Sequence, residues 1–365
     1  MSPRAASGPR DLPPWLRAAL TLALAAAGGG FFAWAGLPLP WMLGAMTATL
    51  LAAMRRAPLA APDRLRGATV AVIGVMLGAG FSGDTLAHFG HWTLSLLGLL
   101  ACVAISAGAV WLFLIRFGRM DPVTALFSAM PGGIVEMTEI GRQHGADERE
   151  IVLAHAARIV LVIALVALWF RVALGLEVRG VAPLNGGETG ALDIAILLAC
   201  GVAGGFLGLR LGLPAPTFLG PMILSAAAHV TGLTEGSPPS WLVICAQVIL
   251  GAIIGCRFLG VAPREVLRAF ALSLGATLIM LAVALGFALG LHRVLGQSAE
   301  QVLLAYAPGG LTEMSLVALS MGADVAYIAT HHLVRVITLL ATAGSLLGWI
   351  ARQLRDQQAS PSSER

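Results

Sequence analysis

One seven-residue element occurs twice in this chain, as PGGIVEM at 131–137 and as PGGLTEM at 308–314. The two copies are 177 residues apart, and a Gly-Ala-Asp turn, a histidine and an arginine follow each copy at the same offset. Matches of Pro, Gly, Glu, Asp, His and Arg in one register are unexpected by chance in an Ala- and Leu-rich sequence. The chain is therefore an internal duplication, and each half carries a glutamate and an arginine within otherwise apolar sequence.

The composition is that of a polytopic membrane protein. Hydrophobic residues make up 58% of the 365 residues, charged residues 12%, and the mean hydropathy is +0.85. Soluble domains carry about 25% charged residues, roughly twice this share. The four cysteines lie in apolar runs without CxxC spacing, so we interpret them as small buried hydrophobic residues and predict neither a metal site nor a cofactor.

Apolar spans recur in the same order in both halves. Most of them approach the 17–25 residues, roughly, that a spanning helix needs. The spans lie at 15–36, 40–54, 67–82, 92–115 and 150–173, then at 190–211, 215–233, 240–258, 266–291 and 325–350. We expect an all-α polytopic fold with two repeats of about five transmembrane helices, each repeat with a PGG hairpin in addition. The predicted parts are a polar N-terminus (1–14), repeat 1 (15–174), an external linker (175–189), repeat 2 (190–351) and a polar tail (352–365).

Matching glycines mark the third span of each half. Gly74 and Gly78 correspond to Gly251 and Gly255, and glycines four residues apart allow helix backbones to approach closely. We therefore interpret these glycines as helix-packing positions.

The PGG elements predict two broken helices. Proline removes a backbone donor and glycine frees the chain to turn, so each element divides its segment into two arms of about ten residues, or roughly 15 Å each. A re-entrant hairpin and a single broken crossing are both compatible with this pattern. With re-entrant hairpins, 18 arginines fall on the cytoplasmic side and 3 outside; with crossing segments the split is 15 to 6. The positive-inside rule thus favours re-entrance, inverted repeats and cytoplasmic termini.

Four charged residues are predicted within the membrane. Glu136 and Glu313 follow the double glycines in the first turn of a helix, where free amides favour negative charge. Arg158 and Arg335 lie 11 residues after Asp147 and Asp324, which we expect to be helix caps. The arginines would then lie about 16 Å into the membrane, near its midplane. We expect the binding residues to be Pro131, Gly132, Gly133, Glu136, Arg158, Pro308, Gly309, Gly310, Glu313 and Arg335.

Two interpretations of these charges remain open. In one, all four line a central cavity, the arginines hold an anionic solute, and a glutamate takes up a coupling proton or cation. In the other, two buried Glu–Arg pairs fix how the hairpins dock. Secondary candidates are residues with less specific signals: His155 and His332 at i, i+3 from the arginines, Thr138, which corresponds to Ser315, and Thr312.

The doubled PGG-x-x-E-M element, with its Gly-Ala-Asp turn and its helix bearing His and Arg, resembles the AbrB-type family of duplicated bacterial membrane proteins. The resemblance extends from about residue 20 to 350. Members are often labelled ammonia monooxygenases or regulators of gene expression. The oxygenase label fits poorly, because copper or di-iron chemistry needs clustered ligands on facing helices and the intramembrane histidines here are dispersed.

The sequence as a whole favours secondary transport in the bacterial inner membrane. Broken helices in inverted repeats form the binding sites of many transporters. We expect a small organic anion as substrate, proton or cation coupling, the lipid bilayer and another copy of the chain as partners, and no direct contact with nucleic acid. A membrane-embedded sensor that acts indirectly on gene expression is the alternative, and a membrane oxidoreductase is a distant third; we expect no enzymatic activity.

Overall fold

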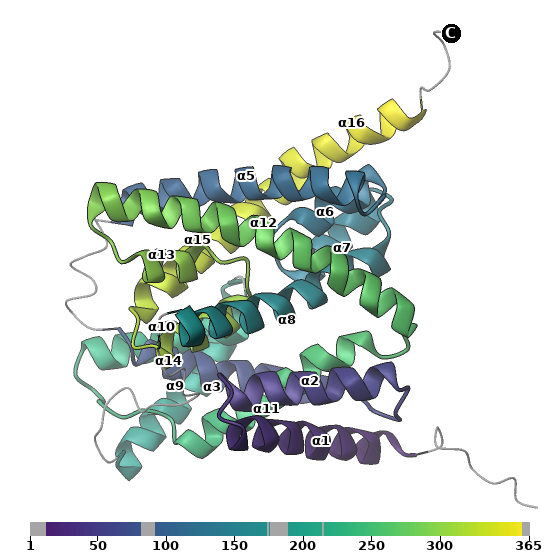
Figure 1. The fold of residues 1–365 in the computed structure, drawn as a ribbon. Helices are drawn as coiled ribbons and strands as arrows, with labels where there is room; N and C mark the ends of the chain where they lie inside the picture. Colours follow the sequence, from purple (N-terminus) through teal and green to yellow (C-terminus); the bar gives the residue numbers. More distant parts are fainter. Residues whose placement is uncertain (1–11, 82–91, 174, 176–188, 214, 360–365) are drawn as a thin grey trace, which may run out of the picture.

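The computed structural model describes residues 12–359, apart from 82–91, 174, 176–188 and 214, and these residues contain helices without strands (Figure 1). The first half contains α1 (Pro14–Trp34), α2 (Pro40–Met54), α3 (Arg66–Gly78), α5 (Thr93–Arg116), α6 (Pro122–Ala129), α7 (Ile134–Gln143) and α8 (Glu148–Ala173). The second contains α9 (Ala191–Arg210), α10 (Pro216–Val230), α11 (Ser240–Gly255), α12 (Pro263–Leu295), α13 (Ala299–Tyr306), α14 (Leu311–Ser320), α15 (Val325–Thr342) and α16 (Gly348–Ala359). Among the described helices, seven are long and apolar enough to cross a membrane, and α2 and α10 are shorter apolar helices.

The two halves exchange helix contacts. In each half the first two helices pack together, α1 on α2 and α9 on α10, while the third helix packs on the other half, α3 on α10 and α11 on α2. The matching glycines form these crossings: a Cβ on Gly74 would lie 2.5 Å from the carbonyl oxygen of Phe218, and one on Gly251 would lie 2.5 Å from that of Met42. The predicted packing role of these glycines is confirmed.

The fourth helices of the two halves form an antiparallel pair. Near the start of α5, Gly98 faces Leu291 at the end of α12. Just after the end of α5, the Gly118 carbonyl accepts a hydrogen bond of 2.9 Å from Arg268, near the start of α12. In Figure 1 the two helices run beside each other along one side of the molecule. Helices α5 and α12 each also pack against a helix of the opposite half: α15 packs on α5, and α8 packs on α12.

The predicted breaks are present at both PGG elements. Helix α6 ends at Ala129 and α7 starts at Ile134, while α13 ends at Tyr306 and α14 starts at Leu311. The backbone at the break is extended, with φ −67° and ψ 140° at Gly133 and φ −72° and ψ 151° at Gly310. Any residue adopts these angles, so the second glycine of the motif is not required for backbone freedom as the sequence pattern suggested. Its role is to leave space, as shown for the site below.

The Gly-Ala-Asp turn ends one helix and starts the next. Gly145 adopts φ 76°, and the amide of Ala146 donates to the carbonyl of Gly141 across the end of α7, which is a Schellman ending. The Asp147 carboxylate then accepts from the amides of Arg149 and Glu150, so it caps α8. Asp324 caps α15 in the same way through the amide of Tyr327. The two predicted caps are confirmed.

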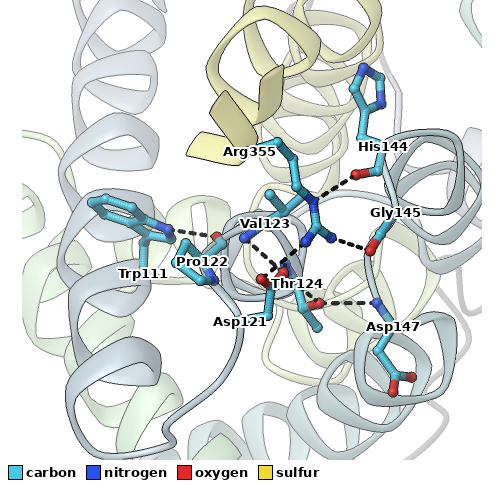
Figure 2. Close-up of polar contacts among 9 residues, drawn as sticks. All are labelled: Trp111, Asp121, Pro122, Val123, Thr124, His144, Gly145, Asp147 and Arg355. Atoms are coloured by element: carbon cyan, nitrogen blue, oxygen red, sulfur yellow. Dashed lines mark hydrogen bonds and ion pairs between the residues drawn. The ribbon is translucent and has the colours of Figure 1, made fainter. Parts of the chain in front are cut away.

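A polar cluster joins the start of α6 to the end of α7 (Figure 2). Asp121 caps α6 through the amides of Val123 and Thr124, and the Thr124 hydroxyl accepts from the amide of Asp147 at 3.0 Å. Arg355 lies 3.4 Å from the Asp121 carboxylate and donates to the Gly145 carbonyl. The chain therefore returns over α7 to the place where α6 began. Arg355 belongs to α16, so the first part of the predicted polar tail is helical and packs on this cluster.

Candidate functional site

The two PGG elements have the same local geometry, and this geometry explains which residue type stands at each position. A Cβ on Gly133 would overlap the Glu136 carboxylate, and one on Gly310 would overlap that of Glu313. The first glycines face the methionines instead: a Cβ on Gly132 would lie 3.0 Å from Cγ of Met137. The second glycine thus provides the space in which a carboxylate folds back over the start of its helix, where free amides stabilise negative charge.

Each buried arginine binds the carbonyl groups at the end of a short helix. Arg158 is 4% exposed and donates to the carbonyls of Ser128 at 3.2 Å and Met130 at 3.1 Å. Arg335 is 2% exposed and donates to those of Ala307 at 2.7 Å and Gly309 at 2.6 Å. Carbonyls at a helix end lack intrahelical partners, so the guanidinium groups stabilise the chain where the PGG elements interrupt it.

Neither glutamate is paired with its arginine. In the described part of the chain, no ion pair joins Glu136 to Arg158 or Glu313 to Arg335, because the arginines bind backbone carbonyls. The direct Glu–Arg pairs that the second interpretation of the sequence expected are therefore not formed in the described structure. Sequence reasoning matched the charges of the side chains and overlooked the orphan carbonyls created by the same break. Among the described residues, no carboxylate forms an ion pair with either arginine cation.

The two histidines differ in their hydrogen bonds. His332 donates through Nε2 to the Leu304 carbonyl at 3.0 Å, and its Nδ1 accepts from Arg335 at 2.8 Å. His155 donates through Nδ1 to the Ile151 carbonyl at 2.9 Å. His332 thus supports Arg335 by direct contact, whereas the hydrogen bonds of Arg158 in the described structure go to backbone carbonyls and not to His155.

Several buried polar atoms near the breaks lack a partner among the described residues. They include the hydroxyls of Thr138 and Ser315, which occupy equivalent positions in α7 and α14, the hydroxyl of Ser128, and the Nε atoms of both arginines. A buried hydroxyl without a hydrogen bond costs about 1–3 kcal/mol. The same unsatisfied hydroxyl occurs at the same position of the motif in both halves, at Thr138 and at Ser315.

A cavity of about 390 Å³ leads from the surface to Arg158. It lies between α5, α6, α8 and α12, and its walls are mainly apolar. The lining residues are Leu114, Met120, Ser128, Asp147, Arg149, Glu150, Leu153, Ala154, Arg158, Glu265, Arg268, Ala269, Leu272, Ser273 and Ala276. Ser128 and Arg158 both line this cavity, which has the size that takes a small organic ligand.

Ion pairs surround the surface end of this cavity. Arg149 contacts Glu265 at 2.8 Å, and Arg268 lies 3.9 Å from Glu150, so the first turns of α8 and α12 are linked across it. These side chains are largely exposed, and the cations and carboxylates offset one another. Arg158 is the buried charge of the cavity without an acidic partner in the described structure, so an anion that enters would meet it as the attractive group.

The structure brings together only part of the predicted site. Arg158 lines the cavity, whereas Glu136, Glu313 and Arg335 are not among its lining residues. Sequence reasoning missed Ser128 and the ring of Arg149, Glu150, Glu265 and Arg268. The ring residues follow the Asp147 cap and the α11–α12 junction, and in the sequence they resemble the loop charges of any membrane protein. No group of three or more His, Cys, Asp or Glu side chains in the described residues is arranged to hold a metal ion.

Comparison with known proteins establishes the family. A family model described as "Transition state regulatory protein AbrB" matches residues 41–351. The chain belongs to the AbrB family. Its curated relatives include the "Putative regulator AbrB" of Escherichia coli, 28% identical over 323 residues, which cover 86% of this chain and 91% of that protein. They also include the "Uncharacterized protein YhjN" of Bacillus subtilis, 28% identical over 357 residues, which cover 88% and 89% of the two chains. The resemblance seen in the doubled motif is confirmed, and the AbrB-family chain has the helices of a membrane protein.

Proposed function

We propose that this AbrB-family protein is a secondary transporter of a small organic anion. The observation that supports this most directly is the cavity that ends at Arg158, a buried cation without a carboxylate partner in the described structure. A buried charge costs several kcal/mol, roughly, unless a counter-charge compensates it. Two carbonyl groups compensate it only in part, so a carboxylate that enters the cavity would be attracted to the guanidinium group of Arg158, with Ser128 beside it in the lining.

The apolar walls of the cavity indicate the chemical character of the part of the solute that carries no charge. Leu153, Ala154, Ala269 and Leu272 offer apolar surface between Arg158 and the charged ring. A ligand with one anionic group and a short apolar body matches this arrangement. A polyanion would leave its further charges against apolar walls, at a desolvation cost.

The glutamates are the proposed coupling groups. Each carboxylate folds over the glycine that starts its helix, and neither has an ion-pair partner in the described structure. A carboxylate held in this way can exchange a proton without disturbing a salt bridge. The unpartnered hydroxyls of Thr138 and Ser315 lie on the same two helices and are further ligands for a coupling cation.

We further propose that the halves are inverted in the bacterial inner membrane, with cytoplasmic termini and with α6–α7 and α13–α14 as re-entrant hairpins. The antiparallel pairing of α5 with α12 supports the inversion. The polar cluster of Asp121, Thr124 and Asp147 supports re-entrance, since it joins the two ends of the first hairpin. On this orientation the Arg158 cavity opens to the cytoplasm.

Uptake into proteoliposomes that contain the purified protein alone tests the function. We expect one or more small monocarboxylates to enter, and we expect Ser128→Ala and Arg158→Lys to slow uptake at least about tenfold, which equals about 1.4 kcal/mol. Leu94→Ala is the matched control, since its side chain is exposed on α5. Absence of uptake for every anion of the panel, with folded protein in the vesicles, would refute transport.

A sensor is the second candidate, because the curated relative of Escherichia coli is named a regulator. The same cavity would then bind an anionic signal and pass it to a partner protein. Binding of an anion at Arg158 without any flux, together with a partner recovered only in its presence, would favour the sensor over the transporter.

A further inference from the structure

The internal duplication provides a second position equivalent to the Arg158 cavity, and this position is filled. The offset of 177 residues holds from Gly74 and Gly251 to Arg158 and Arg335. At this offset Ala154 and Ala269, which line the cavity, correspond to His331 and Trp92. A third cavity residue, Glu150, corresponds to the aromatic Tyr327.

Those residues form one packed cluster. The Tyr327 ring stacks on that of His331 with 3.9 Å between centroids, and Trp92 packs edge-on against Tyr327 at 5.3 Å. Ser95 lies 2.8 Å from Nε2 of His331, and the Tyr306 hydroxyl donates to the Ser95 carbonyl. The four rings are at most 5% exposed. Where the first half leaves a cavity, the second half has a closed aromatic cluster, defined here as Trp92, Tyr306, Tyr327 and His331.

The cavity and the aromatic cluster lie at opposite ends of the α5–α12 pair. Leu114, near the end of α5, lines the cavity, whereas Trp92 directly precedes the start of α5. The 22 residue steps from Trp92 to Leu114 span about 33 Å of helix, close to the thickness of a bilayer core. Arg158 and Arg335 lie on the helices that pack on this pair, α8 on α12 and α15 on α5. The open cavity and the aromatic cluster thus lie about one bilayer core apart along the same helix pair.

We propose that the aromatic cluster closes the second of two equivalent solute chambers and must move apart for the solute to leave at that end. This inference rests on the transport function proposed above and adds the residues that gate its far side. Rings are suited to this role, because they fill the chamber with few rotatable bonds and are held by hydrogen bonds that can exchange with water. The first chamber lacks the rings and therefore stands open in this structure.

A native thiol reports on the closed chamber. Ser95, Leu99 and Cys102 share the buried face of α5, and Cys102 lies about 10 Å deeper than Ser95. Cys102 is buried, and its sulfur lies 3.9 Å from the Ser106 hydroxyl one turn further along α5. With Cys200, Cys245 and Cys256 replaced by serine, the rate at which a membrane-impermeant methanethiosulfonate reagent modifies Cys102 measures access to this chamber.

The test variant is Trp92→Ala with His331→Ala, which places alanine at both positions, as at Ala269 and Ala154 of the first chamber. We expect Cys102 to react at least tenfold faster in this variant than with both aromatic residues present, and we expect no change in the Leu94→Ala control. An unchanged rate in folded protein would overturn the proposal. Equally fast modification with the cluster intact would also overturn it, because the chamber would then not be closed.

Two further measurements keep the outcome decisive. Trp92→Leu removes one ring with a smaller loss of volume, so it applies the same criterion if the double variant does not fold. Anion uptake is measured separately on each variant. Faster modification of Cys102 without uptake of any anion would support the closing role of the aromatic cluster and refute transport. Anion uptake together with no effect of the aromatic substitutions on either rate would refute only the closing role of the cluster.

Discussion

Replacing Gly133 by alanine separates the function of the motif from its stability. The new Cβ would lie 2.9 Å from the carboxylate carbon of Glu136 and would overlap one of its oxygens, so the carboxylate must move by about 1 Å or more. The backbone needs no change, because φ −67° and ψ 140° suit alanine. Alanine lowers the entropy of the unfolded chain, which contributes about 0.4–1 kcal/mol to stability, and the displaced carboxylate loses about 0.3–1 kcal/mol at the helix start.

These terms nearly cancel, so we expect the stability of Gly133→Ala in detergent to stay within about 1 kcal/mol of wild type. Anion uptake should nevertheless fall at least about tenfold, as it should for Glu136→Gln, because the carboxylate is no longer in place. Thermal melting and proteoliposome uptake are measured on the same preparations. A loss of more than about 2 kcal/mol, or full uptake with normal stability, would refute this account of the motif.

Three further predictions concern the fold. Gly74→Ala should destabilise the protein by about 1–3 kcal/mol, because its Cβ meets the backbone oxygen of Phe218, while Gly286→Ala, which meets open space, should not; equal melting of the two variants would contradict this. Asp121→Ala should cost about 1–2 kcal/mol through loss of the α6 cap, and an unchanged denaturation midpoint would argue against that cap. Ala215→Gly should leave stability equal or raise it by about 1 kcal/mol, since Ala215 adopts φ 48°, and a clear loss in the same assay would exclude strain there.

Much of the architecture could be predicted because duplication doubles every local signal. The breaks at the PGG elements, the Asp147 and Asp324 caps and the glycine crossings at Gly74 all depend on local chemistry that occurs twice. A sequence pattern that occurs at equivalent positions in both halves is less easily a coincidence, so it predicts the local structure more specifically than a single occurrence would.

The partners of the charges could not be predicted in the same way. The sequence shows Glu136 and Arg158 as opposite charges in one segment, but the carbonyl groups left free at the end of α6 have no sequence signature, and they bind the arginine. The contrast between the open cavity in one half and the aromatic cluster in the other could not be predicted from the sequence either. It depends on which helix of one half packs on which helix of the other, and this pairing is set by tertiary structure.

The most direct test of the central claim is the thermal stability of the purified protein against a panel of small carboxylates. A ligand that binds only the native state raises its stability, by about 2.7 kcal/mol at a hundredfold excess over Kd. We expect one carboxylate to stabilise wild type, and we expect no such shift in Arg158→Ala or in Ala269→Trp, which fills the cavity with the residue found at the equivalent position 92. An identical shift in folded Ala269→Trp and Arg158→Ala would contradict the claim that the Arg158 cavity is the solute site.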